Sequence, residues 1–265
     1  MSLRVALAGV GAVGAVVGRI LADAPDFDVT AIAVRDEGKA RAQLPGFSGQ
    51  FTTPDDLHTH ADVVVEALPA ALFRSVAEPT LRAGKTFLPL SIGQLLTHWD
   101  LVEGAGAHGG RIIAPTGALL GLDAVRAAAE GTIESVTMKT RKPPGGLAGA
   151  PYLKTHGIRI EGISEPTCVY AGSVREAAAG FPANLNVAAA LSLAGIGPDA
   201  TRLEVWADPS VTRNIHTIEV EADSARFAMT IENVPSEENP RTGKITALST
   251  VAALRSLNTP VRIGS

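Results

Sequence analysis

The feature that most constrains the fold lies at the start of the chain, where an apolar run ends in closely spaced glycines. Residues 3–14 read LRVALAGVGAVG, and Gly9, Gly11 and Gly14 have the spacing G-x-G-x-x-G. Apolar residues continue at helical spacing as far as Leu21. This order predicts a strand, a tight turn and a helix whose N-terminus receives a pyrophosphate. We therefore expect the chain to bind a dinucleotide.

Each glycine of this motif has its own physical reason. Gly9 permits the turn, Gly11 lets phosphate approach the backbone, and Gly14 lets the helix pack closely on the strand. The cofactor contacts expected in this segment are Gly9, Gly11, Ala12, Val13 and Gly14. The alternatives are a glycine-packed helix without a ligand and a secretory signal peptide. Arg19 and the glycines interrupt the apolar stretch, which favours a buried strand–helix unit over a signal peptide.

Composition excludes several classes of protein. A hydrophobic content of 46% with 19% charged residues excludes a disordered chain, and no apolar segment of spanning length lacks glycine, proline or charge, so we expect no membrane association. The net charge of −4 leads us to expect no nucleic-acid partner. Cys168 is the only cysteine, which excludes an internal disulfide and multi-cysteine metal sites and fits a cytoplasmic location. We expect no metal site, and we interpret Cys168 as a packed small residue.

Residues 1–117 alternate strand-like and helical patterns. The expected strands are residues 4–8, 29–34, 62–67, 86–90 and 111–114, and the expected helices are residues 12–22, 71–83 and 94–104, with a single turn at 54–58. This alternation predicts an α/β domain, a doubly wound parallel sheet covered on both faces. Its ligand crevice is expected at the carboxyl ends of the strands.

The pattern changes over residues 118–239, for which we predict a second, α+β domain that supplies the chemistry. The expected helices are residues 122–130, 174–179 and 186–193, and the expected antiparallel strands are residues 133–140, 203–207, 215–221 and 225–233. Residues 143–157, rich in proline and glycine, predict a mobile loop. The last stretch, residues 240–265, contains a helical pattern at 242–257 and is expected to complete the first domain.

The end of the second expected strand bears on the choice of cofactor. A carboxylate here holds the adenosine ribose of NAD, whereas a cation accommodates the 2′-phosphate of NADP. The chain offers both, because Arg35 is followed by Asp36. The sequence leaves NAD and NADP open, with a slight preference for contact through Arg35.

One histidine stands apart from the others. His216 ends the segment DPSVTRNIH, a turn that leads into a strand of the domain expected to carry the chemistry. An imidazole titrates near neutral pH, so it can move a proton or activate water against an imine. The alternative is a structural histidine at a strand edge.

Several blocks along the chain, taken together, resemble the L-aspartate dehydrogenase family. They are residues 115–123 (PTGALLGLD), 140–143 (TRKP), 175–178 (REAA), 181–189 (FPANLNVAA), 214–216 (NIH) and 238–242 (ENPRT). The resemblance implies a Rossmann domain with an α+β catalytic domain, commonly as a homodimer. It also implies that His216 is catalytic and that Ala118 and Asn186 contact the cofactor. The chain departs from the family at Arg35 and at Gly243, where the family often has serine.

The reaction implied by the resemblance is the oxidation of L-aspartate. Hydride passes from C2 to nicotinamide C4, giving iminosuccinate, and water then releases oxaloacetate and ammonia; iminosuccinate can also supply NAD biosynthesis. A dicarboxylate needs cationic or amide donors, for which the candidates are Arg141, Lys142 and Asn186. The alternative for Arg141 and Lys142 is that they are surface charges beside a loop.

Three other functions compete with this interpretation. The first is a related sugar dehydrogenase or dihydrodipicolinate reductase; the sugar enzymes carry Glu-Lys-Pro at the end of the fifth strand, where this chain has Leu90, Ser91, Ile92 and Gly93. The second is an oxidoreductase for a different amine or imine. The third is a cofactor-binding sensor without turnover, against which the joint presence of His216, Asn186 and the glycine turn argues.

Overall fold

A computed structural model describes residues 2–181, 185–239 and 242–264. Five residues of the blocks that carry the family resemblance therefore lie outside the described residues, namely Pro182, Ala183, Asn184, Pro240 and Arg241. The chain divides into two compact units. Unit 1 consists of Met1–Gly117 and Thr246–Arg262, and unit 2 consists of Ala118–Ile245 and Ile263–Ser265.

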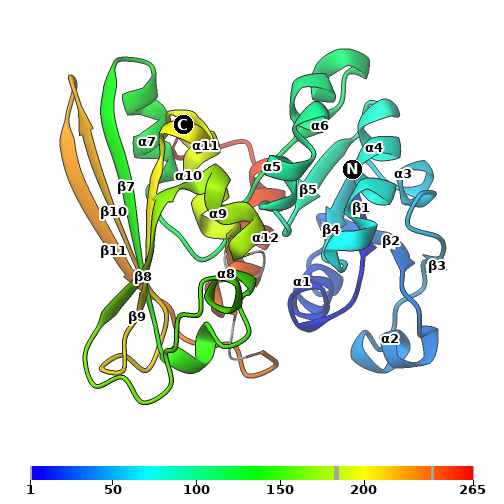
Figure 1. The fold of residues 1–265 in the computed structure, drawn as a ribbon. Helices are drawn as coiled ribbons and strands as arrows, with labels where there is room; N and C mark the ends of the chain where they lie inside the picture. The colour runs from blue at the N-terminus through cyan, green and yellow to red at the C-terminus, as the bar shows by residue number, and fades with distance from the viewer. Residues whose placement is uncertain (1, 182–184, 240–241, 265) are drawn as a thin grey trace. The chain divides into compact units, whose positions relative to one another are not determined.

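Unit 1 is built on a parallel sheet of six strands in the order β3-β2-β1-β4-β5-β6 (Figure 1). The strands are β1 (Leu3–Ala8), β2 (Phe27–Ala33), β3 (Gln50–Phe51), β4 (Val63–Glu66), β5 (Thr86–Pro89) and β6 (Arg111–Ile112). The strand order reverses between β1 and β4, which is the topology of a doubly wound dinucleotide-binding fold. The predicted parallel sheet is thus confirmed, and the glycine-rich run begins at its switch point, directly after β1.

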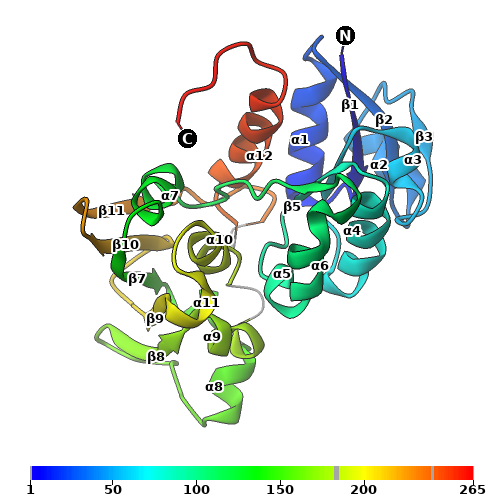
Figure 2. The same cartoon turned by 90° about the horizontal axis from the view of Figure 1, so that it is seen from above.

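Helices cover this sheet, and the last helix of the chain is one of them. They are α1 (Ala12–Ala22), α2 (Glu37–Gln43), α3 (Leu57–His60), η1 (Ala70–Leu72), α4 (Phe73–Arg82), α5 (Gln94–Thr97), α6 (Trp99–Gly104), η2 (Ala105–His108) and α12 (Ile245–Ser256). All four residues of β4 are buried, as expected for a strand covered on both faces. In α12, Ala247, Val251 and Leu254 join the apolar cluster that contains Val5 and Leu21, and Figure 2 shows α12 beside α1.

Two predicted helices of unit 1 differ from the structure. The one expected at residues 71–83 begins with the 3-10 turn η1, and the one expected at 94–104 is broken at His98, whose backbone lies outside the helical region at φ −120° and ψ 53°. The His98 ring stacks on Phe73 with centroids 5.7 Å apart.

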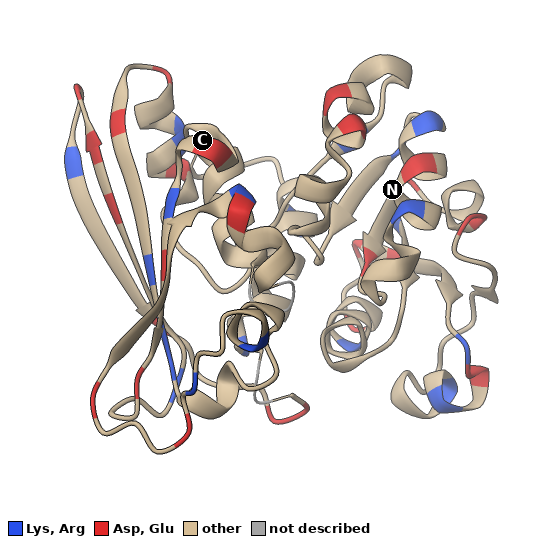
Figure 3. Cartoon of the chain, in the orientation of Figure 1, with Lys and Arg blue, Asp and Glu red and all other residues tan. Residues whose placement is uncertain are grey.

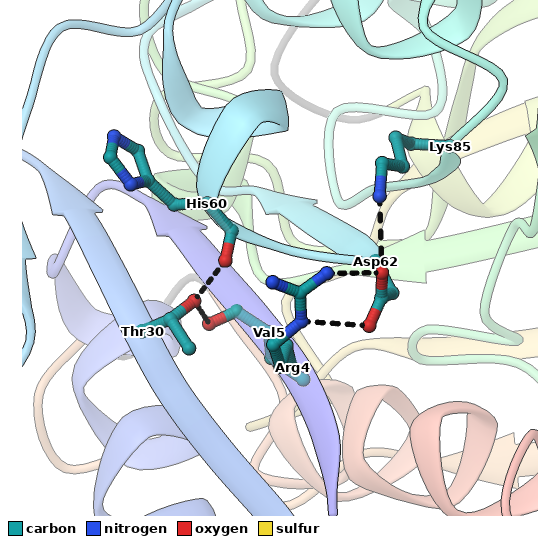
Figure 4. Close-up of polar contacts among 6 residues, drawn as sticks. All are labelled: Arg4, Val5, Thr30, His60, Asp62 and Lys85. Atoms are coloured by element: carbon teal, nitrogen blue, oxygen red, sulfur yellow. Dashed lines mark hydrogen bonds and ion pairs between the residues drawn. The ribbon is translucent and has the colours of Figure 1, made fainter.

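Ion pairs join the strands at the amino edge of this sheet (Figure 4). Arg4, at the start of β1, donates to both carboxylate oxygens of Asp62, and Lys85 donates to Oδ1 of the same residue at 3.1 Å. The hydrogen bond from Arg4 holds the pKa of Asp62 below its ordinary value. Thr30 adds a hydrogen bond to the carbonyl oxygen of His60 at 2.9 Å. These contacts hold together the edge opposite to the one where the glycine turn lies.

Unit 2 contains a five-stranded sheet in the order β11-β10-β7-β9-β8. Its strands are β7 (Ile133–Lys142), β8 (Thr167–Ser173), β9 (Arg202–Ala207), β10 (Ile215–Ala222) and β11 (Arg226–Glu232), and its helices are α7 (Leu122–Ala129), η3 (Pro144–Gly146), α8 (Pro151–Thr155), α9 (Val174–Gly180), α10 (Asn186–Ala194) and α11 (Gly197–Ala200). The helices α7, α9 and α10 lie on one face of the sheet (Figure 1). Figure 3 marks positively and negatively charged residues along the strands of this sheet. Lys139 of β7 and Glu219 of β10 form an ion pair at 3.1 Å.

Several expectations for this unit were wrong. The strands β7 and β9 are parallel rather than antiparallel, because the chain between them is long enough to cross over and return. The predicted loop at residues 143–157 contains the short helices η3 and α8. Cys168 is exposed on the edge strand β8 rather than packed, since a register shift follows it in the pairing with β9.

Candidate active site

The glycine turn of unit 1 is fixed by two positions that have no room for a side chain. Gly9 has φ +97°, and a Cβ built on it would lie 2.7 Å from the carbonyl oxygen of Ala67. A Cβ on Gly14 would collide with the carbonyl oxygen of Gly9. The backbone of the turn therefore packs against both the end of β4 and the first turn of α1, which requires glycine at both positions.

The middle glycine is different, because it faces open space. Gly11 is exposed, and a Cβ built on it meets no atom within 4 Å. It precedes α1 without a side-chain cap, and the first helical hydrogen bond is that from Ala15 N to Gly11 O. The N–H groups of Ala12, Val13 and Gly14 therefore have no carbonyl partner within the helix and carry the positive end of its dipole. An open approach to free N–H groups fits the pyrophosphate of NAD or NADP.

The residues after β2 are compatible with the adenosine end of either NAD or NADP. Asp36 caps α2, and its Oδ1 accepts a hydrogen bond from Lys39 N at 2.9 Å. Arg35 is exposed beside it. The cap occupies one carboxylate oxygen of Asp36 and leaves the other available to a ribose, while the Arg35 guanidinium is available to a phosphate.

Glu66 is a buried carboxylate that the sequence analysis did not single out. It ends β4 and is 0% exposed. Its Oε1 accepts from Leu68 N at 2.9 Å and from Ser91 Oγ at 3.1 Å, and its Oε2 accepts from Ser91 N at 3.1 Å. Burial raises the pKa of Glu66, although these hydrogen bonds oppose the rise. The carboxylate joins the loops that follow β4 and β5, at the edge of the sheet where the glycine turn lies.

Replacing Glu66 by glutamine is expected to destabilise unit 1. Three donors from Leu68 and Ser91 point at the two carboxylate oxygens, and an amide offers one oxygen and one NH2 group. One donor would lose its acceptor, at a cost of about 1–3 kcal/mol. Urea unfolding of the two proteins measures the difference. Ser91→Ala, which removes a donor and leaves the carboxylate, should cost less; equal stability of Glu66→Gln and the parent would contradict this role.

In unit 2, strand pairing brings His216 directly opposite Thr140. The strands β10 and β7 are antiparallel, and these two residues are register partners. Thr140 Oγ1 and His216 Nδ1 are 2.8 Å apart, and the His216 residue is only 2% exposed. The hydrogen bond fixes the plane of the imidazole, leaving Nε2 as the ring nitrogen that can meet a ligand.

Lys142 lies two residues along β7 from Thr140 and therefore points to the same face of the sheet. It is 5% exposed, and burial lowers the pKa of its ammonium to about 8. Burial lowers the pKa of His216 to about 3, and the positive charge of Lys142 contributes to the same shift. The pKa of His216 thus lies well below the ordinary imidazole value, and Lys142 is the group of the two whose pKa lies closer to neutral pH.

The pKa of His216 predicts an acid-dependent loss of stability. Between pH about 6.5 and about 3 the unfolded chain binds a proton at this imidazole and the folded chain does not. Stability should therefore fall as the pH falls, by about 1.4 kcal/mol for each pH unit in this window. Urea unfolding at several pH values should give a flatter profile for His216→Gln than for the parent. His156→Gln, on the exposed end of α8, serves as the control; parallel profiles for His216→Gln and the parent would contradict the shift.

The structure does not bring Arg141 and Lys142 together, because neighbouring residues of a strand point to opposite faces. Arg141 Nε donates to Oδ2 of Asp208 at 2.7 Å. Ser210 donates to Oδ1 of the same carboxylate from its N and its Oγ, at 2.8 and 2.6 Å. Burial works to raise the pKa of Asp208, but the bonds from Ser210 and Arg141 outweigh it and hold the pKa below its ordinary value. Asp208 thus holds the segment between β9 and β10 in place through its hydrogen bonds with Ser210 and Arg141.

Asn233, directly after β11, connects Ala118 to the strand that carries His216. Its Nδ2 donates to the carbonyl oxygen of Ala118 at 3.1 Å, and its backbone N donates to Asn214 O at 2.9 Å. Its Oδ1 is buried without a hydrogen-bond partner, and a Cβ on Gly243 would lie 2.7 Å from this atom. Glycine at position 243 therefore leaves room for the Asn233 amide. Asn186, the other expected cofactor contact, is half-buried at the first position of α10.

The described residues contain neither a metal-binding cluster nor a membrane-spanning helix. Within residues 2–181, 185–239 and 242–264, no group of three or more His, Cys, Asp or Glu side chains is arranged to hold a metal ion. None of the helices in this part of the chain is long and apolar enough to span a membrane.

Comparison with known proteins agrees with the two units. The family model described as "Homoserine dehydrogenase, NAD binding domain" matches residues 9–115, and the one described as "Aspartate dehydrogenase, C-terminal" matches residues 123–257. An L-aspartate dehydrogenase of Bradyrhizobium diazoefficiens is 53% identical over 265 residues, covering 99% of this chain and 94% of the relative. One of Methanosarcina mazei is 37% identical over 271 residues, covering 99% and 100%.

Solved structures give the fold. The crystal structure of aspartate dehydrogenase from Thermotoga maritima has a TM-score of 0.75 and 22% identity, covering 100% of both chains. A scyllo-inositol dehydrogenase of Lactobacillus casei has a TM-score of 0.52 and 15% identity, covering 100% of this chain and 92% of the other. The fold alone is thus shared with sugar-type dehydrogenases.

The parallel sheet, its glycine turn and the NAD-binding match define a nicotinamide-dependent oxidoreductase that uses NAD or NADP. The fold does not distinguish among such enzymes, but the identity along the whole chain does. The chain belongs to the L-aspartate dehydrogenase family.

Proposed function

We propose that this protein oxidises L-aspartate at C2 with NAD or NADP, forming iminosuccinate, and that hydrolysis of the imine gives oxaloacetate and ammonia in a reversible reaction. The observation that supports this most is the buried His216, hydrogen-bonded to Thr140 and beside Lys142, in a chain 53% identical to an L-aspartate dehydrogenase. The cofactor, when bound, supplies the hydride acceptor at its nicotinamide ring. The residues below supply the remaining chemistry.

The turn after β1 would bind the cofactor's pyrophosphate through the N–H groups of Ala12, Val13 and Gly14. Asp36 would bind the ribose of NAD, and Arg35 would pair with the 2′-phosphate of NADP. The family resemblance adds Ala118 and Asn186 as cofactor contacts. Asn233 would then act as a positioning residue, because its amide holds the Ala118 carbonyl.

His216 would act as a neutral imidazole, since its pKa of about 3 keeps it uncharged at working pH. When Nδ1 donates to Thr140 Oγ1, Nε2 carries a lone pair and can accept a proton from water. A water held by a hydrogen bond to Nε2 directs its oxygen lone pair at the imine carbon.

For the substrate carboxylates, we propose Asn186 as an amide donor and Lys142 as the cation that lies on the same face of the sheet as His216. Arg141 remains a predicted carboxylate donor as well. Its bond to Asp208 leaves it half exposed, so any contact with substrate would be made from within that ion pair.

Absorbance of the reduced cofactor tests this function directly. The purified protein is mixed with NAD or NADP and L-aspartate, and in the reverse direction with reduced cofactor, oxaloacetate and ammonium. We expect activity in both directions, with D-aspartate, L-asparagine, L-glutamate and L-alanine far weaker. L-Malate and an inositol are included to detect oxidation of alcohols in place of amines.

Each alternative function predicts a different result of this assay. Preference for another amino acid would indicate an oxidoreductase for a different amine, and oxidation of the inositol would indicate a sugar dehydrogenase. Cofactor binding without turnover of any substrate would indicate a sensor. Any of the three would contradict the proposed substrate.

Three finer proposals accompany this function. We propose that the iminosuccinate can be taken by another enzyme, which would supply NAD biosynthesis, and that the protein works in the cytoplasm as a homodimer. The dimer follows from the family resemblance. Light scattering on a size-exclusion column tests it, and a monomeric mass at working concentration would contradict it.

A further inference from the structure

Lys142 is a buried cation without a structural task among the described residues. Among the described residues, no carboxylate contributes to the pKa of its ammonium, which burial alone lowers. The other lysine near this end of β7, Lys139, is half-exposed and pairs with Glu219 at 3.1 Å. A buried ammonium without a carboxylate partner is costly, and groups with such shifted pKa values cluster at functional sites.

Lys142 lies on the face of the sheet that His216 occupies. One residue of β7 separates Lys142 from Thr140, and Thr140 pairs with His216 of β10, so both side chains stand on the same face. The charge of Lys142 also lowers the pKa of His216, so the two groups lie within electrostatic reach of each other. A small ligand on this face can meet both nitrogens.

We propose that Lys142 is a second catalytic residue of the reaction proposed above, and that its Nζ takes the proton from the substrate ammonium before hydride transfer. The inference rests on that proposed function and assigns its first proton transfer to the lysine. His216 keeps the later step, the handling of water at the imine.

The step balances in atoms and electrons. A substrate N–H bond breaks, a new N–H bond forms at Lys142 Nζ, and the electron pair remains on the substrate nitrogen. When C2–H then leaves as hydride to the oxidised nicotinamide, this pair forms the second bond of C2=N. The substrate is oxidised by two electrons, the nicotinamide is reduced by two, and Lys142 holds the proton as an ammonium.

The charged groups around Lys142 fit this role. On β10 it faces His216, which stays neutral; after β9 the Asp208 carboxylate is engaged by Arg141 and Ser210. Burial is the sole cause of the lowered pKa of Lys142, about 8, so no carboxylate stabilises its charged form. With this pKa, part of the Lys142 population is deprotonated near neutral pH and can accept a proton. An ordinary lysine, whose pKa is about 10.4, is almost fully protonated there.

The test replaces Lys142 by arginine and by methionine. Arginine keeps the positive charge but cannot give up its proton in a protein, so Lys142→Arg separates proton transfer from charge. We expect kcat to fall about 10²-fold or more in both variants, with no burst of reduced cofactor in the first turnover. In the parent, kcat/KM for oxidation should rise with pH up to about 8, and this rise should be absent from both variants.

Chemical rescue and a matched control complete the experiment. Small primary amines should restore turnover to Lys142→Ala in proportion to their concentration, which a merely structural lysine would not allow. Lys139→Met, on the same strand and the opposite face, should keep the parent's kcat. Melting temperature and the fluorescence of bound reduced cofactor verify that each variant is folded and binds.

Failure of this inference is distinguishable from failure of the proposed function. A parent enzyme that oxidises no amine would overturn the function itself. If the parent oxidises an amine and Lys142→Arg retains most of kcat with a raised KM, Lys142 serves only as the carboxylate-binding cation proposed above and does not transfer the proton. The inference would also be overturned if the rise of kcat/KM up to pH about 8 persisted in Lys142→Arg. The same holds if small amines failed to restore turnover to a folded Lys142→Ala.

Discussion

Replacement of His216 by alanine is expected to lower steady-state turnover of L-aspartate by about 10²-fold or more while leaving the affinity for reduced cofactor unchanged. The imidazole is a unit 2 side chain held by Thr140, whereas the pyrophosphate site is the glycine turn of unit 1. Because His216 is proposed to act on water after the imine has formed, one equivalent of reduced cofactor should still appear rapidly. Stopped-flow absorbance measures this first turnover and the slow phase that follows.

The control for this variant is His156→Ala, whose imidazole is exposed and bonded to the carbonyl oxygen of Tyr152. It should match the parent in both phases. Unchanged steady-state turnover in His216→Ala would remove the imidazole from the mechanism. Loss of the first turnover would place His216 at or before hydride transfer, in conflict with the role assigned to Lys142.

Replacement of Gly11 by alanine is expected to weaken dinucleotide binding by about tenfold or more without destabilising the protein. A methyl group here meets no protein atom within 4 Å, so the fold has room for it. It would nevertheless stand where the pyrophosphate must approach the N–H groups of α1, and each 1.4 kcal/mol lost there is tenfold in affinity. Titration of reduced-cofactor fluorescence gives the affinity, and thermal melting gives the stability.

Two other glycines provide matched comparisons. Gly14→Ala adds the same methyl group where it collides with Gly9 O, so it should destabilise the folded protein itself. Gly104→Ala, at the exposed end of α6 with no atom within 4 Å, should change neither property appreciably. A Gly11→Ala protein with the parent's cofactor affinity would contradict the site, and one with a lowered melting temperature would contradict the reason given for it.

The glycine turn and the sheet around it were predictable because local sequence determines them. An apolar strand, a glycine at positive φ and a helix follow one another within residues 3–22, so the pattern needs no distant contact. The helix α2 escaped prediction because only Ala40 of its seven residues is buried, which leaves it without an apolar stripe. The strand β3 has two residues, too few for any periodicity.

The strand β8 escaped prediction for a related reason. Its burial does not alternate, because it is an edge strand with a shifted register between Cys168 and Tyr170. Strand alternation is the signal by which sequence predicts a half-buried strand, and the shift interrupts it.

The partners in the candidate active site could not be found from sequence, because they depend on register. His216 was identified from its position in a turn leading to a strand, but Thr140 lies 76 residues away and meets it only through the pairing of β10 with β7. Lys142 was expected as a substrate ligand, yet its burial follows from the face on which β7 places it. Glu66 fell within the expected strand at residues 62–67, and its three donors come from the two loops that follow β4 and β5.

The place of α12 in unit 1 has a consequence for biosynthesis. The strands of the dinucleotide-binding sheet precede unit 2 along the chain, whereas Ala247, Val251 and Leu254 of its apolar cluster follow unit 2 and are synthesised after it. Domains generally fold as units while synthesis proceeds, so unit 2 has nearly all of its residues before unit 1 does. Until α12 has been synthesised, the sheet beside α1 keeps an apolar surface exposed, and a chain truncated before residue 245 is expected to need a chaperone rather than to bind its coenzyme.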